Sequence, residues 1–164
     1  MPRSYLLVLG ERAAIAWVLS EERMAFPSMA RREVAALAQG DQLYLYATRG
    51  AWHNPTRDRG RIIAKATATS AAQALDEPIV LVERKFYAGC TLLINGLVPY
   101  PGGLELAPLV PQLKAFPKSH AWSIYLRRAL LALPDRDAQV IDGMLRPLLR
   151  NRDNILKTYP NRSA

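Results

Sequence analysis

The sequence predicts an α+β fold built on a mixed sheet or small barrel of five or six strands flanked by helices. Short extended segments recur along the chain, and some of them alternate apolar and polar residues. The helical segments between them differ in length, so there is no regular strand–helix repeat. With 164 residues, the chain is about one domain and is long enough to bury one core.

The clearest strand pair lies on either side of a basic loop. Residues 43–48 alternate with a period of two, placing leucine and alanine on one face and tyrosine and threonine on the other. Residues 61–69 form a second extended run. Between them, residues 49–60 have no periodicity and contain Gly, Pro, Trp and three arginines, which is typical of a loop. The other expected strands are 5–9, 23–27, 79–87, 91–94 and 97–98.

Four helices are expected from good helix formers with apolar residues at helical spacing. They cover residues 11–20, 29–39, 119–133 and 135–148. Ser28 is a good N-cap for the second of them, and Gly40 is placed to end it in the left-handed conformation. Residues 70–78 are expected to be a linker or a single helical turn. The pair Asn95-Gly96 is typical of a tight turn between two strands.

The formal net charge of +8 is concentrated in two segments. Residues 49–65 and residues 146–162 each carry an excess of four positive charges, and the rest of the chain is neutral. Local positive charge favours a polyanionic partner, most simply nucleic acid, although a basic surface can also serve solubility alone. We expect a domain over residues 1–149, followed by a basic, flexible C-terminal tail over residues 150–164.

The remaining composition argues against an enzyme and against a membrane protein. Cys90 is the only cysteine, and it lies among apolar strand residues with only two histidines elsewhere, so neither a nucleophile nor a metal site is expected. No glycine-rich phosphate loop is present, and no cofactor is expected. No apolar run is long enough for a signal sequence or a membrane span. These features predict a soluble, cytoplasmic, non-catalytic protein of unknown oligomeric state.

The order of elements resembles that of a known family. A helix capped by Pro-Ser ends at Gly40-Asp41, and the strands LYLYAT and GRIIAKATAT follow on either side of the loop. A later segment places Trp122 before Tyr-Leu-Arg-Arg. Over residues 4–149 this order resembles the EVE domain, a member of the PUA-like superfamily that includes the YTH and ASCH domains. The resemblance implies a mixed β pseudobarrel with a pocket between the capped helix and the first central strand. It also implies binding of RNA, or of one modified base of RNA or DNA.

Reading an unstacked base requires aromatic faces, hydrogen-bonding groups and cations for the phosphates. Trp52 is the strongest candidate, because a loop does not need tryptophan for its own folding. The full set of candidate base- and phosphate-binding residues is Phe26, Ser28, Arg31, Tyr46, Thr48, Arg49, Trp52, His53, Arg57, Arg59 and Arg61. Phe26 and Tyr46 could equally be core residues, and Ser28 only a helix cap. The alternative ligand is a small nucleotide-like molecule or another metabolite in the same pocket. A third reading is an interaction protein whose tail docks a partner.

Overall fold

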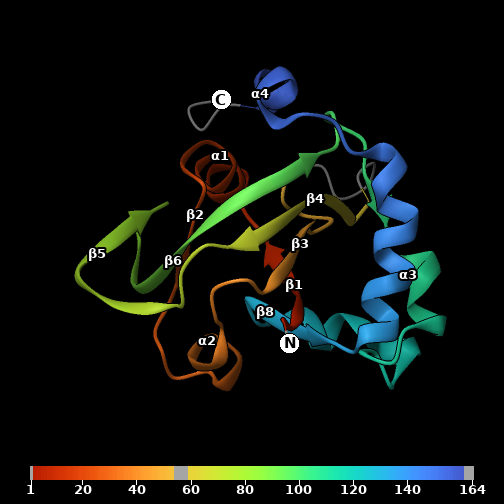
Figure 1. Ribbon diagram of the computed structural model, residues 1–164, viewed down its shortest axis with the longest axis horizontal. Helices are drawn as coiled ribbons and strands as arrows, with labels where there is room; N and C mark the ends of the chain where they lie inside the picture. Colours follow the sequence, from red (N-terminus) through yellow and green to blue (C-terminus); the bar gives the residue numbers. More distant parts are fainter. Residues whose placement is uncertain (1, 54–58, 161–164) are drawn as a thin grey trace.

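The computed structural model describes residues 2–53 and 59–160, and it shows a mixed sheet with helices packed on both faces (Figure 1). The strands are β1 (Ser4–Leu9), β2 (Arg23–Phe26), β3 (Gln42–Ala47), β4 (Arg61–Ala68), β5 (Gln73–Leu81), β6 (Arg84–Leu97), β7 (Leu104–Glu105) and β8 (Leu130–Leu133). The α-helices are α1 (Arg12–Glu21), α2 (Arg32–Ala36), α3 (Asp135–Leu145) and α4 (Arg152–Ile155). Short 3₁₀ helices cover Ala107–Gln112, Ser119–Leu126, Arg146–Leu148 and Leu156–Thr158. Among the described residues, no helix has the length and apolar character needed to cross a membrane.

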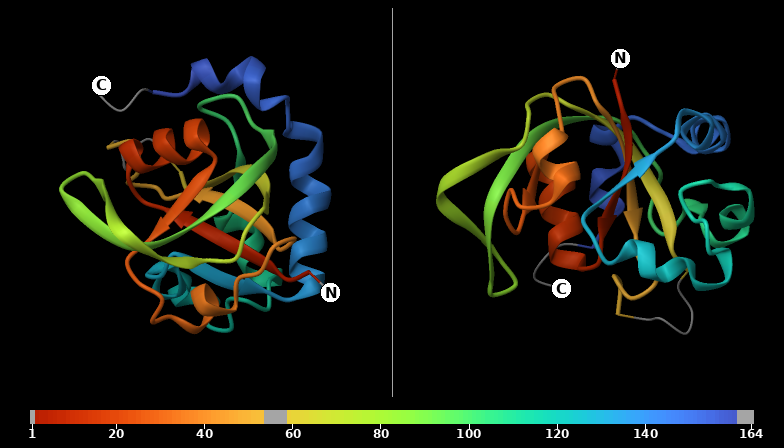
Figure 2. Two further views of the ribbon diagram at one scale, coloured as in Figure 1. Left: turned by 60° about the vertical axis from the view of Figure 1, so that its left-hand side comes forward. Right: turned by 90° about the horizontal axis from the view of Figure 1, so that it is seen from below.

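Across the sheet the strand order is β2-β6-β4-β3-β1-β8, with β5 added to β6 and β7 added to β4. β1 runs parallel to β3, and the other pairs are antiparallel. The sheet curls around α1, and the long β5–β6 ribbon projects from the body of the molecule (Figure 2). A mixed, curled sheet with flanking helices confirms the predicted α+β pseudobarrel class.

Two apolar cores lie on opposite faces of the sheet, and the alternation of β3 divides its side chains between them. The face of Leu43 and Leu45 packs with α1, β2 and β6. The face of Tyr44 and Tyr46 packs with α3 and the 3₁₀ segments. Ala47 lies in the same core as Leu43 and Leu45, so the period of two predicted over residues 43–48 holds from Leu43 to Ala47.

The helix predicted over residues 119–133 is wrong. Ser119–Leu126 forms a 3₁₀ helix with a kink at Ala121, and Leu130–Leu133 is strand β8, which pairs antiparallel with β1. A short apolar run is compatible with either a helix or a buried strand, so its periodicity did not decide between them. Pairing decides it, because β1 would otherwise leave one backbone edge without hydrogen bonds.

The predictions for the β5–β6 ribbon are also wrong. Residues 73–81 form strand β5 rather than a linker or helical turn, and β6 continues through Asn95-Gly96 without a turn. The ribbon reverses at Val82 and Glu83 instead, both with positive φ (49° and 62°). Gly96 serves close packing, because a Cβ there would lie 2.9 Å from Cβ of Leu149.

The turn into β3 explains Gly40 and revises the role of Ser28. Gly40 has the predicted positive φ (95°), but α2 ends at Ala36, so Gly40 lies in the turn into β3 and does not end the helix. Its N–H donates to the carbonyl of Ala68. α2, however, begins only at Arg32, so Ser28 does not cap it; its hydroxyl accepts from the Ala30 N–H instead. The buried Asp41 carboxylate accepts from the N–H of Ala38 in the turn and from the N–H of Arg3 just before β1, which ties the entry into β3 to the start of β1.

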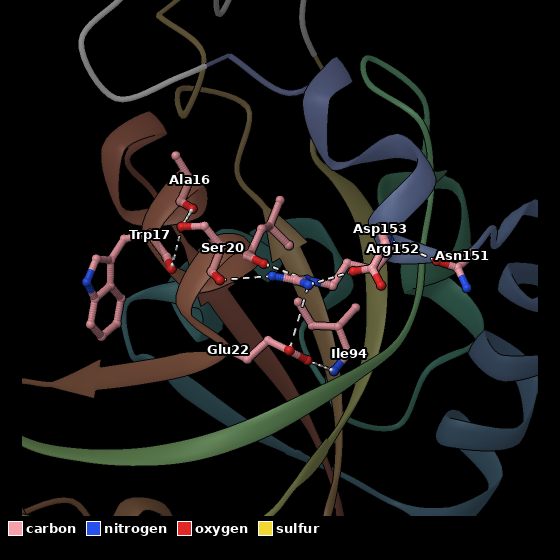
Figure 3. Close-up of polar contacts among 9 residues, drawn as sticks. Ala16, Trp17, Ser20, Glu22, Ile94, Asn151, Arg152 and Asp153 are labelled. Carbon is pink, nitrogen blue, oxygen red and sulfur yellow. Dashed lines mark hydrogen bonds and ion pairs between the residues drawn. The ribbon is translucent and has the colours of Figure 1, made fainter.

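The described part of the C-terminal segment packs against the domain rather than extending from it. The Arg152 side chain donates from Nε to the Leu19 carbonyl (2.8 Å) and from Nη2 to the Ser20 carbonyl (2.9 Å), at the end of α1 (Figure 3). These carbonyls have no partner within the helix, and a guanidinium also complements the helix dipole there. Glu22 lies 3.8 Å from Arg152 and accepts from the Ile94 N–H of β6 (2.8 Å). One arginine thus connects α4, α1 and β6.

Replacing Arg152 tests this attachment. We expect Arg152→Ala to lower the free energy of unfolding by about 2–3 kcal/mol, because hydrogen bonds that involve a charged partner contribute roughly 1.5–3 kcal/mol. The measurement is urea denaturation followed by circular dichroism. Lys157→Ala, an exposed change in the same segment, should stay within about 0.5 kcal/mol of the wild type. Equal effects of the two substitutions would show that the segment contributes nothing to stability.

Candidate nucleic-acid interface

Trp52, the leading candidate from sequence, belongs to an aromatic cluster. Its ring centroid lies 5.0 Å from that of Tyr100 and 6.0 Å from that of Tyr159. The Tyr159 hydroxyl in turn donates to the Val98 carbonyl. Trp52 is half-buried and anchors the basic loop to the C-terminal segment. It lines none of the three cavities described below, so its role in binding remains a prediction.

Phe26 and Tyr46 are core residues in this structure. Phe26 is fully buried in the core around α1, and Tyr46 is 2% exposed in the core on the opposite face. Burial raises the pKa of Tyr46 to about 12. Its ring also explains Gly60, since a Cβ at that position would lie 1.8 Å from the Tyr46 hydroxyl. Both side chains therefore lie in the core, as the alternative interpretation predicts.

The arginines that follow the loop face a carboxylate. Arg59 Nε and Arg61 Nη2 each lie 3.7 Å from Glu105 Oε1 in β7. Arg61 also donates to the Pro101 carbonyl (3.0 Å). Glu105 therefore offsets part of the positive charge that the sequence concentrates in this segment.

The other loop candidates lie at the surface. Arg49 and His53 are exposed, and His53 Nε2 lies 3.6 Å from Glu11 Oε2. Arg57 lies outside the described residues. Phosphate binding by the loop arginines thus remains a prediction.

The alternation over residues 43–48 predicts that Thr48 lies on the same face as Tyr46, but the structure separates the two. β3 ends at Ala47, and the Thr48 N–H donates to the Leu9 carbonyl at the end of β1. Thr48 therefore lines a cavity of about 360 Å³, here called the aromatic cavity, bounded by α1, β2, the β5–β6 ribbon and residues 126–129. Trp17 and Phe86 contribute aromatic walls to it.

Arginines surround these aromatic walls. The Arg84 guanidinium carbon lies 5.3 Å from the centroid of the Phe86 ring, and that of Arg23 lies 5.4 Å from the centroid of the Trp17 ring. Both distances are typical of cation–π contacts. Arg127 also lines the cavity. The cavity can therefore offer a flat apolar ligand two aromatic rings with positive charge close by.

A second cavity of about 330 Å³ adjoins the first and is lined by two of the candidate residues, Ser28 and Arg31. Pro27, Arg127 and Arg128 line both cavities, which makes them neighbours on one surface. Of the residues singled out from sequence, the structure brings Thr48, Ser28 and Arg31 to this surface.

The two aromatic residues of the cavity wall are not among the candidates predicted from the sequence. Trp17 lies on an apolar helical stripe and is only 7% exposed, so its pattern is that of a core residue, yet it also lines the cavity. Arg84 and Phe86 alternate onto one face of an extended segment in the sequence, and this pattern could have indicated that both line the same cavity. Arg127 and Arg128 fell inside a segment read as helix.

The described residues contain no cluster of three or more His, Cys, Asp or Glu side chains that could hold a metal ion. Cys90 is buried in β6, and burial raises the pKa of its thiol from 9.0 to about 11. A neutral, buried thiol is a poor nucleophile.

The Cys90 thiol should therefore react slowly in the folded protein. At pH 8 a shift of two pKa units leaves roughly 100-fold less thiolate than in the unfolded chain, so we expect labelling by a thiol reagent to slow at least by that factor. Since only the unfolded thiol ionises just above pH 9, the shift also lowers the free energy of unfolding as the pH rises through that range. The labelling rate of Cys90 at pH 8, compared with and without urea, measures the difference in thiol reactivity between the folded and the unfolded chain. Equal rates would show that Cys90 is accessible and reactive.

The chain matches no protein-family model and no curated protein, but its fold is similar to that of several solved structures. The Mmi1 YTH domain in complex with RNA aligns with a TM-score of 0.56 and 11% identity, over 98% of this chain and 84% of that one. For PSPTO5229 from Pseudomonas syringae the TM-score is 0.53, with 10% identity over 86% and 98% of the two chains. The YTH domain of Zygosaccharomyces rouxii MRB1 in complex with N6-methyladenosine RNA gives 0.51, with 12% identity over 86% of each chain. At these identities the likeness shows the fold, which YTH domains share; membership of the EVE family remains a prediction.

Proposed function

We propose that this protein binds single-stranded nucleic acid without catalysis and accommodates one modified or flipped base in the aromatic cavity. The observation that carries the proposal is the joint placement of Trp17, Phe86 and Thr48 around one cavity with arginines at its edge. Base recognition outside a duplex needs this combination of a stacking surface, a hydrogen-bonding group and cations.

The dimensions and chemistry of the cavity support a ligand of this size. Its volume of about 360 Å³ lies within the range of roughly 300–1,000 Å³ typical of small-ligand sites. Met24 and Leu81 add apolar wall, and the Thr48 hydroxyl can donate or accept a hydrogen bond at a base edge. An apolar wall is also suited to an added methyl group.

The surrounding charges support a polymer rather than a neutral molecule. Arg31, Arg84 and Arg127 are exposed and line the aromatic cavity or its neighbour. Arginine side chains pair well with phosphates. The similarity of fold to two YTH domains crystallised with RNA, one of them with N6-methyladenosine RNA, agrees with this reading.

A small nucleotide-like metabolite is the alternative occupant, because the aromatic cavity alone is large enough to hold one. The dependence of binding on salt separates the two. The affinity for a single strand should fall steeply between 50 and 200 mM salt, with a slope of about −0.7 per phosphate contact on logarithmic axes. Binding of a small metabolite, which makes few phosphate contacts or none, should change much less over the same range.

Phe86→Ala tests the cavity directly. It removes one aromatic wall, and stacking of a base on an aromatic ring contributes about 1–3 kcal/mol, so we expect the affinity for a single-stranded hexanucleotide to fall about 5- to 150-fold. The measurement is fluorescence anisotropy with RNA hexamers that do or do not contain N6-methyladenosine.

Tyr87→Ala is the matched control. Tyr87 follows Phe86 in β6 but is 49% exposed and does not line the aromatic cavity. It should leave the affinity close to that of the wild type. If both substitutions weaken binding equally, the cavity is not the site of the base.

A further inference from the structure

We infer that the nucleic-acid strand continues from the aromatic cavity past Arg128 into a separate groove between α2 and α3. The inference rests on the proposed function and extends it from one base to the path of the strand. The groove, here called the basic groove, has a volume of about 1,360 Å³ and runs over the start of β1, β8 and α3. In Figure 1, α2 and α3 lie on either side of β8.

Continuity of the surface is the first support. Arg128 lines the aromatic cavity, the adjoining cavity and the basic groove, and Glu33 lines the last two. The three depressions therefore meet at Arg128, and its partner Glu33 lines two of them. A strand with one base in the aromatic cavity would meet this pair at the entrance to the groove.

The charge of the groove is the second support. Arg3 and Arg32 line it and are exposed at its surface. Within the described part of the chain, its acidic lining residues are Glu33, Asp135 and Asp142, against the four arginines Arg3, Arg32, Arg128 and Arg146. Asp142 accepts hydrogen bonds from Lys65 (2.6 Å) and Arg146. Burial acts to raise the pKa of Asp142, but these hydrogen bonds hold it below its ordinary value. Two cations therefore offset this carboxylate, and Arg3 and Arg32 remain exposed to phosphates.

The Arg128–Glu33 contact is the third support, because it places an exchangeable cation at the junction. Arg128 Nη1 lies 3.1 Å from Glu33 Oε1, and the two side chains are 36% and 18% exposed. A phosphate at the junction can replace the carboxylate as the partner of Arg128. Glu33 then opposes the strand electrostatically, so its removal should strengthen binding.

The first experiment compares Glu33→Gln with Glu105→Gln. Both remove one negative charge beside an arginine, but Glu105 faces Arg59 and Arg61 near the basic loop. With a single-stranded nonamer we expect Glu33→Gln to raise the affinity and to steepen the salt slope by about 0.7, as for one added phosphate contact. Glu105→Gln should change neither. The opposite result would place the strand on the loop arginines and overturn the inference.

The second experiment removes the exposed arginines of the groove. Arg3→Gln/Arg32→Gln should reduce the salt slope for the nonamer by about 1.4 and weaken its binding, while a trimer that fills the aromatic cavity keeps its affinity. The matched control, Lys118→Gln/Arg136→Gln, removes the same charge from exposed residues that line none of the three cavities. Equal losses in the two double variants would show an effect of net charge alone and overturn the inference.

Failure of the two proposals gives different results. If neither the trimer nor the nonamer binds the wild-type protein at 50 mM salt, the proposed function is wrong, and the inference with it. If the nonamer binds and Phe86→Ala weakens it while the groove variants do not, only the path of the strand is wrong. If the groove variants weaken the nonamer and Phe86→Ala does not, the groove binds the strand without a base in the cavity.

Discussion

The parallel pairing of β1 with β3 positions the whole candidate interface. Six residues of each strand pair in register, from Ser4 with Gln42 to Leu9 with Ala47. Parallel strands cannot be joined by a tight turn, so the chain between them must cross over, and here residues 10–41 form α1, β2 and α2. The crossover supplies walls to all three cavities, and the Leu9 carbonyl holds Thr48 at one of them. The candidate site is therefore formed largely by the crossover connection that the parallel pairing of β1 and β3 requires.

Positive charge is distributed in space differently from its distribution along the chain. The two segments that carry the excess charge in the sequence contain cations that the fold pairs internally, as with Arg152 at the end of α1 and Lys65 with Asp142. Several exposed arginines at the cavities, such as Arg31 and Arg127, come instead from the part of the chain that is neutral in total. Counting charges along the sequence cannot reveal this, because ion pairs join residues far apart in the chain.

The same limitation explains which parts of the fold and site were predictable. The class of fold and the pair β3–β4 followed from local periodicity, whose physical cause lies within a few residues. Strand β8 did not, because only its pairing with β1 decides its conformation. Thr48 is a candidate because the alternation places it on the face of Tyr46, but β3 ends at Ala47 and Thr48 lines a cavity away from Tyr46. Trp52 is a candidate because of its place in a loop, and its packing partners Tyr100 and Tyr159 lie too far along the chain to be predicted. Residues whose role depends on distant contacts were those that sequence reasoning misplaced.

Arginines differ in how readily they can leave their partners for a phosphate. Arg152 is 18% exposed and donates to two carbonyls that would otherwise lack a partner, so its release would leave polar groups unsatisfied. Arg128 is twice as exposed and has a carboxylate partner, and pairs near the surface contribute only about 0–1 kcal/mol. Exchange of Glu33 for a phosphate would therefore cost Arg128 little. Arginines held by weak, exposed contacts around the cavities can bind a strand without disturbing the fold, while the partly buried Arg152 maintains the fold on which those cavities depend.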